Sequence, residues 1–182
     1  MATTESIKAG CCCANSSACC SEQESNQEKR QIHIDFMYID LSVCTRCKGT
    51  GGSLDDAVAD VEAVLKAVGI VVAVNKIHIT SEQQAQELRF ASSPTIRVNG
   101  HDIQLEVKES LCESCGDLCG DEVDCRVWVF QGKEYNVPPK AMIVDAILRE
   151  VYGGRSSAPA ENEEFVLPDN LKNFFQVMEG KG

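Results

Sequence analysis

The 182-residue sequence lacks the charge and hydropathy patterns of proteins that bind nucleic acids or span membranes. It has 17 Lys and Arg residues against 28 Asp and Glu residues, and its formal net charge is −11. Phosphate backbones and anionic lipids attract clustered basic side chains, so we expect neither nucleic acid nor a membrane as a partner. No apolar run approaches the roughly 20 residues of a membrane-spanning helix. The first residues, MATTESIKAG, lack the pattern of a secretory signal, and we expect a soluble, cytoplasmic protein.

The sequence is also poor in the residues that common hydrolytic and nucleotide-binding sites require. Its three histidines, His33, His78 and His101, fall in predicted strands or just after a predicted turn. We expect each to be a satisfied or exposed side chain and not a metal ligand. The glycines that follow Cys47 lack the Lys-Ser/Thr of a phosphate-binding loop. The sequence therefore suggests no Ser-His-Asp triad, no catalytic carboxylate pair and no nucleotide site.

Cysteine, in contrast, is abundant, because the chain has 11 of them. The count is odd and the cytosol keeps thiols reduced, so metal binding or thiol chemistry explains these residues better than a disulfide scaffold does. The cysteines fall into three groups along the chain: Cys11, Cys12, Cys13, Cys19 and Cys20; Cys44 and Cys47; and Cys112, Cys115, Cys119 and Cys125.

The first group lies in residues 1–30, which are rich in Ser, Glu, Gln and Asn and have no apolar period. This composition predicts a disordered tail, because it buries too little apolar surface to offset the loss of chain entropy. The thiols of CCCANSSACC can capture a soft ion such as zinc, copper(I), arsenite or mercury, or deliver it to folded thiols. The alternative is an unstructured tail without a defined role.

The second group follows the first predicted strand, residues 32–40, in which apolar and polar side chains alternate. The stretch VCTRCKGTGG permits three interpretations: a redox dithiol, half of a zinc site, or one C-x-x-C-x-G-x-G unit of a DnaJ-type chaperone. A chaperone of that type repeats the unit, and this chain has one copy. The glycines after the second cysteine predict that the next regular helix is delayed until Ser53.

The patterns that follow predict alternating helices and strands. Apolar residues at spacings of three and four indicate a helix from Ser53, and residues 70–80 form an apolar run typical of a strand covered on both faces. Ser81 predicts the start of a short helix. Asn99-Gly100 predicts a hairpin whose second strand covers residues 103–105. A later strand and a helix that begins after prolines complete this region.

Two motifs in this order resemble those of the thioredoxin superfamily. Cys44-Thr45-Arg46-Cys47 directly follows the first strand, and Ser93-Pro94-Thr95-Ile96 directly precedes the hairpin. The resemblance covers residues 31–153 and implies an α/β fold with a thioredoxin-like central mixed sheet flanked by helices. It also implies that Cys44 attacks the disulfide of a protein or small molecule and that Cys47 resolves the mixed disulfide. Pro94 would be cis, pack beside the dithiol and shape the substrate groove.

The third group lies in a predicted Cys-rich insertion, residues 106–125, within the sequence LCESCGDLCGDEVDC. Four thiolates in so short a segment, with glycines that permit tight bends, can surround a tetrahedral ion. Zinc is the leading interpretation; an iron–sulfur cluster, a second redox pair or relay to Cys44, and unbound thiols are the alternatives. The acidic neighbours raise the pKa values of these thiols, which favours a bound cation over free nucleophiles.

The end of the chain is predicted to form a linker, residues 154–164, and a short amphipathic helix within residues 165–182. The apolar side chains that recur there at helical spacing are Leu171, Phe174, Phe175 and Met178. We expect this helix to fold back onto the domain, and docking on a partner is the alternative.

Two functions agree with these patterns. The first is a thioredoxin-like thiol-disulfide oxidoreductase that uses the Cys44/Cys47 dithiol. The second is a soft-metal or metalloid protein without redox turnover, in which the three cysteine groups hold or transfer zinc, arsenite or mercury. A thioredoxin-like scaffold with surplus thiols suits detoxification or metal-stress work.

Overall fold

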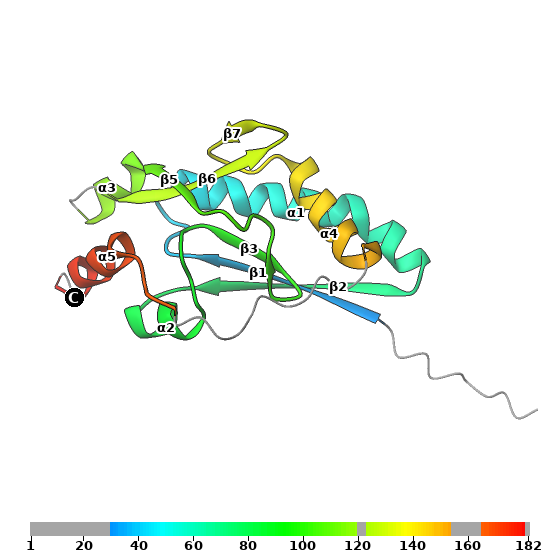
Figure 1. Cartoon of the computed structure of the whole chain (residues 1–182), viewed down its shortest axis with the longest axis horizontal. Helices are drawn as coiled ribbons and strands as arrows, with labels where there is room; N and C mark the ends of the chain where they lie inside the picture. The colour runs from blue at the N-terminus through cyan, green and yellow to red at the C-terminus, as the bar shows by residue number, and fades with distance from the viewer. Residues whose placement is uncertain (1–29, 120–122, 154–164, 181–182) are drawn as a thin grey trace, which may run out of the picture.

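The computed structural model describes residues 30–119, 123–153 and 165–180, without the side chains of residues 117–119 (Figure 1). The tail predicted for residues 1–30 lies outside this description except for Arg30, as does the predicted linker 154–164. The described residues form an α/β fold in which a mixed four-stranded sheet is flanked by helices, as predicted. In the part of the chain that is described, no helix combines the length and apolar character needed to cross a membrane.

The central sheet is built around β1 (Arg30–Tyr38). On one side β1 pairs in parallel with β2 (Ile70–His78), and on the other it pairs antiparallel with β3 (Thr95–Val98). The short β4 (His101–Asp102) follows β3, so the strand order is β2-β1-β3-β4. The apolar side chains that alternate along the first half of β1 are buried, namely Ile32, Ile34 and Phe36.

The connection from β3 to β4 is the hairpin that the sequence predicts. Asn99 (φ 50°) and Gly100 (φ 85°) both adopt left-handed backbone conformations, which this two-residue turn requires. The returning strand, however, is His101–Asp102 and not residues 103–105. The Asp102 carboxylate accepts a hydrogen bond from the backbone N–H of Gln104 at 2.9 Å, which forms an Asx-turn. This turn follows the two residues of the strand directly.

The prediction that β2 is covered on both faces is wrong, because this edge strand of the central sheet has exposed valine side chains. Val71 and Val74 are 43% and 37% exposed. Ile70 is buried, and Val72 packs against the core under the helices. Val71 and Val74 point to opposite faces of the strand, so each face of β2 is only partly covered.

α1 (Thr45–Ala67) begins earlier than the sequence predicts. Its N-cap is Cys44, so the regular helix includes the glycines and does not wait for Ser53. A Cβ atom at Gly51 would lie only 3.2 Å from Cε1 of Phe36, so glycine lets the helix approach the sheet closely. Gly51, within the helix, thus allows close packing against the sheet, and the positive end of the helix macrodipole lies at the dithiol.

α1 and α4 (Lys140–Tyr152) lie together over one face of the central sheet, as Figure 1 shows. Their apolar side chains pack against β1 and β3 and form one of two buried clusters, which we call the helix-side core. Its members are Ile32, Ile34, Phe36, Leu54, Ala57, Val61, Leu65, Ile70, Ile96, Val98, Trp128, Met142, Ile143, Ile147 and Val151.

Between β4 and α4 the chain forms a second, antiparallel sheet of order β5-β6-β7. Its strands are β5 (Lys108–Leu111), β6 (Asp124–Phe130) and β7 (Lys133–Tyr135), and α3 (Glu113–Cys119) lies in the connection from β5 to β6. Trp128 of β6 belongs to the helix-side core, whereas Cys125 belongs to the second buried cluster. β6 therefore joins this part of the chain to both clusters.

α2 (Glu82–Glu87), with Ser81 as its N-cap, and α5 (Asp169–Glu179) lie near the end of β1 that leads into α1 (Figure 1). α5 falls within the range predicted to form an amphipathic helix, and it packs against the domain. It contributes to the second cluster, which we call the cysteine-side core. The members are Met37, Ile39, Cys44, Cys47, Ile79, Ala85, Phe90, Cys112, Cys115, Val123, Cys125, Leu167, Leu171, Phe174 and Phe175.

Candidate thiol and metal site

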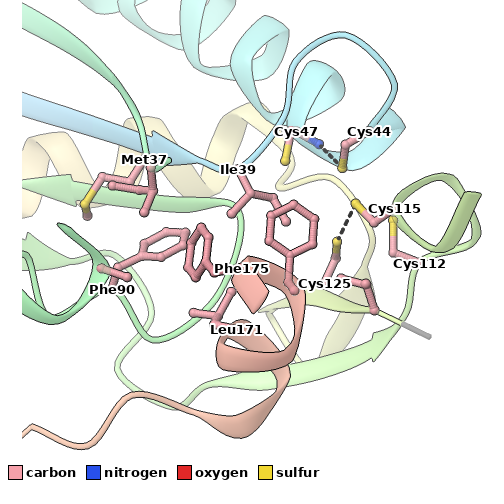
Figure 2. Close-up of a cluster of buried hydrophobic side chains, with 14 of the residues drawn as sticks. Met37, Ile39, Cys44, Cys47, Phe90, Cys112, Cys115, Cys125, Leu171 and Phe175 are labelled. Atoms are coloured by element: carbon pink, nitrogen blue, oxygen red, sulfur yellow. Dashed lines mark hydrogen bonds between the residues drawn. The ribbon is translucent and has the colours of Figure 1, made fainter. Parts of the chain in front are cut away.

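Four cysteine thiols meet inside the cysteine-side core (Figure 2). The Sγ atoms of Cys44, Cys112, Cys115 and Cys125, which we call the four-thiol group, all lie within 4.8 Å of one another. The Sγ atoms of Cys115 and Cys125 are 3.5 Å apart. All four residues are buried. Thiols from two distant parts of the sequence therefore converge on one small volume.

The turn between β1 and α1 places Cys44. The Asp40 carboxylate accepts the backbone N–H of Val43 at 2.5 Å and that of Cys44 at 3.1 Å. Burial raises the pKa of Asp40, but the backbone hydrogen bonds from Val43 and Cys44 and the hydroxyl of Ser42 outweigh burial and lower it overall. The carboxylate is thus ionised and holds Cys44 at the N-cap of the helix.

Local structure brings the other three thiols together. Cys112 immediately precedes α3, and its carbonyl accepts the N–H groups of Cys115 and Gly116, each at 3.0 Å. The N–H of Cys112 donates to the carbonyl of Val123 at 2.8 Å, which fastens this turn to the chain just before β6. Cys125 follows on β6 and is buried. Three of the four thiols therefore come from one short stretch of the chain, between the end of β5 and the start of β6.

Arg46 fastens the first turn of α1 to the second sheet. Its guanidinium donates to the carbonyl oxygens of Ser110 (3.2 Å), Leu111 (2.8 Å) and Cys125 (3.0 Å), and to the Ser110 hydroxyl (3.0 Å). Among the ion pairs between described residues, none involves Arg46. A buried cation held by neutral groups therefore lies beside the thiols.

Cys47 is a fifth buried thiol and lies outside the four-thiol group. Its N–H donates to the Cys44 Sγ at 3.3 Å, and its own Sγ lies 3.4 Å from the Ser93 Oγ. The peptide bond between Ser93 and Pro94 is cis, as the resemblance implies. Figure 2 shows Cys44 and Cys47 side by side at the start of α1, with Cys44 nearer to the other three thiols.

Hydrogen bonds among the thiols separate their pKa values. Hydrogen bonding with the neighbouring thiols, that of Cys112 above all, lowers the pKa of Cys44 well below its usual range. Hydrogen bonds from Cys115 and Cys125 lower the pKa of Cys112 to about 6. The other three pKa values shift upward: hydrogen bonding with Cys112 raises the pKa of Cys115 and of Cys125, and hydrogen bonding with Cys44 raises that of Cys47. The site therefore stabilises negative charge on sulfur.

α5 covers one side of the four-thiol group. Asn170 accepts the backbone N–H of Asp124 at 3.1 Å and donates to the Asp124 carbonyl at 2.9 Å, which ties the helix to the residue before Cys125. Phe174 and Phe175 meet edge to face, with ring centroids 5.4 Å apart, and are buried in the cysteine-side core. The helix thus shields the thiols from solvent.

Residues 32–147 match the model of a protein family described as a domain of unknown function, DUF2703. The chain belongs to this family. The match runs from β1 into α4 and includes the whole four-thiol group, whereas α5 lies beyond it. No curated protein and no solved structure matches the chain.

The DUF2703 domain brings together cysteines that the sequence analysis assigned to two separate sites. Cys44, interpreted as half of a dithiol, joins three cysteines interpreted as metal ligands. Cys119 is the last residue of α3, and its side chain lies outside the described part of the structure. The five tail cysteines lie outside it as well: Cys11, Cys12, Cys13, Cys19 and Cys20.

Two contributors to the DUF2703 site have little signal in the sequence. The first is Arg46, whose position between two cysteines does not reveal which groups its guanidinium contacts. The second is Ser93, because the motif before the hairpin does not reveal that its hydroxyl lies next to the Cys47 sulfur. A pocket of about 540 Å³, lined in part by Arg46, Cys112 and Ser114, opens beside the thiols. The arrangement can bind a metal ion or carry out thiol redox chemistry.

Proposed function

We propose that this protein binds one thiophilic metal ion through the thiolates of Cys44, Cys112, Cys115 and Cys125. The observation that carries the proposal is the convergence of these four Sγ atoms within 4.8 Å of one another. Zinc prefers four ligands in a tetrahedron with Zn–S bonds of about 2.3 Å, which separates neighbouring sulfurs by about 3.8 Å. The sulfurs of this site need only small shifts to reach that geometry.

The ligand set supports a closed site for a soft or borderline ion. Four thiolates select zinc, copper(I) or another thiophilic ion over hard cations such as magnesium. With four protein ligands a tetrahedral ion has no open position for water, which is typical of structural or storage sites and not of hydrolytic ones. The spacing Cys112-x-x-Cys115 also falls within the range common in structural zinc sites.

The charges around the thiols support an anionic complex. A divalent ion with four thiolates carries a net charge of about −2, which is costly to bury without compensation. The buried guanidinium of Arg46 and the N-terminus of α1 at Cys44 both offer positive charge to it. Ion binding would also join α1 to the second sheet. Cys44 lies at the start of α1, and the other three ligands lie between the end of β5 and the start of β6.

The test uses full-length protein in which the five tail cysteines are serine, purified without oxygen and analysed for bound zinc. We expect about one zinc ion per chain. Serine at any one of the four ligand positions should abolish stoichiometric binding. Cys47→Ser is the matched control, because it removes a buried thiol of the same cluster that is not one of the four ligands. Equal zinc content in Cys44→Ser and Cys47→Ser would contradict the proposal.

A second candidate function, a thioredoxin-like thiol-disulfide oxidoreductase in the cytoplasm, is favoured by two observations. Cys44 caps α1 and accepts the N–H of Cys47, and a cis Ser93–Pro94 bond lies beside Cys47. Burial of both thiols disfavours it, since attack on a protein disulfide needs an accessible sulfur.

Turnover of a model disulfide separates this candidate from metal binding. If the protein is an oxidoreductase, the tail-substituted protein reduces insulin or oxidised glutathione with a reductant present, and Cys44→Ser loses that activity. Absence of turnover from both proteins would reject the oxidoreductase function and leave metal binding untouched.

A further inference from the structure

Cys44 belongs to two groups of thiols at once. Its Sγ is a member of the four-thiol group, and it also accepts the N–H of Cys47 at 3.3 Å within the first turn of α1. Cys44 therefore cannot be a metal ligand and form a disulfide with Cys47 at the same time. Any ion at the four-thiol group competes with the Cys44–Cys47 disulfide for one sulfur.

We propose that oxidation links Cys44 to Cys47 and thereby releases the ion, so that the redox state of this dithiol controls metal occupancy. The inference rests on the proposed metal-binding function and adds its regulation. In the loaded protein Cys112, Cys115 and Cys125 all hold the ion. Among the cysteines whose side chains the structure describes, Cys47 is the thiol that remains outside the ligand set and beside a ligand.

The surroundings of Cys47 suit a resolving thiol. Its Sγ lies 3.4 Å from the Ser93 hydroxyl, which can hold the thiol in place without consuming it. It lies three residues after Cys44 on the same helical turn, the spacing at which C-x-x-C pairs form disulfides. The pocket of about 540 Å³ beside Cys112 offers a small oxidant such as hydrogen peroxide a way toward the ligands, although α5 covers the other side.

The chemistry balances with hydrogen peroxide as the oxidant. The Cys44 thiolate attacks one peroxide oxygen, the O–O bond breaks, and Cys44 sulfenic acid and hydroxide form. The Cys47 sulfur then attacks the Cys44 sulfur, the S–O bond breaks, and hydroxide leaves and takes the Cys47 proton as water. The two sulfurs lose two electrons to peroxide, and the ion is left with three thiolates.

The experiment uses the full-length protein with serine at the five tail cysteine positions, reduced and loaded with zinc. One equivalent of hydrogen peroxide is added, zinc release is followed with a colorimetric indicator, and disulfides are mapped by peptide mass spectrometry. We expect the protein to release its zinc with formation of the Cys44–Cys47 disulfide and to rebind zinc after reduction with dithiothreitol. Cys47→Ser should bind zinc equally well when reduced but release it at least about tenfold more slowly.

Cys47→Ala accompanies Cys47→Ser, and zinc bound before oxidation reports that each variant keeps an intact site. Zinc release from Cys47→Ser at the rate of the parent protein would overturn the inference, as would a mapped Cys115–Cys125 or Cys112–Cys115 disulfide in place of Cys44–Cys47. In both cases the proposed metal binding still stands. A reduced parent protein that holds no zinc would instead contradict the proposed function, and this is measured before any oxidant is added.

Discussion

The two buried clusters take side chains from opposite faces of β1 but are built from different chemistry. Ile34 and Phe36 enter the helix-side core, which is held by apolar packing beneath α1 and α4. Met37 enters the cysteine-side core, as does Ile39 just after the end of β1. This second cluster contains five thiols and is closed by α5. The first cluster is stabilised by the burial and close packing of apolar side chains, whereas the proposed functions make the stability of the second depend also on the oxidation and metal occupancy of its sulfurs.

The largest expected effect comes from a cavity in the helix-side core. Phe36 is fully buried, and its ring lies against the backbone of α1 at Gly51. Phe36→Ala should lower the free energy of unfolding by about 3–5 kcal/mol, with or without zinc, in urea denaturation. Phe175→Ala is the matched variant in the cysteine-side core and should also speed the release of zinc. Zinc release from Phe36→Ala as fast as that from Phe175→Ala would break the distinction between the two clusters.

Removal of the metal tests whether the stability of the cysteine-side core depends on bound zinc. When free zinc exceeds the dissociation constant 100-fold, binding to the native state adds about 2.7 kcal/mol to the free energy of unfolding. Chelation should therefore lower the thermal midpoint of the parent protein and of Cys47→Ser. It should leave Cys112→Ser unchanged, because that variant lacks a ligand. A chelator effect of equal size in Cys112→Ser would place the bound zinc elsewhere.

A smaller effect is expected at Arg46, which joins α1 to the second sheet. If its charge offsets that of the complex, Arg46→Met weakens the binding of zinc by about tenfold, or about 1.4 kcal/mol. Trivalent arsenic bound by three thiolates is neutral, so its affinity should change little. Arg46→Lys should restore part of the zinc affinity. Equal losses for zinc and arsenite would show that Arg46 serves only to hold the backbone in place.

Several elements could be predicted because their signals are local. The alternation along β1, the left-handed turn at Asn99-Gly100 and the helical spacing of apolar residues in α5 each depend on neighbouring residues alone. The start of α1 could not be predicted in this way. The glycines indicate a late start if only local conformational freedom is considered, but Gly51 is needed where the helix meets Phe36 of β1.

By itself the sequence determined that the chain is rich in thiols, that a C-x-x-C pair follows the first strand, and that four further cysteines lie close together late in the chain. Only the tertiary structure decided that Cys44, while it stays beside Cys47, also meets Cys112, Cys115 and Cys125. The reason is physical: residues far apart in sequence meet only when the Arg46 hydrogen bonds and the packing of β6 bring the second sheet against the first turn of α1.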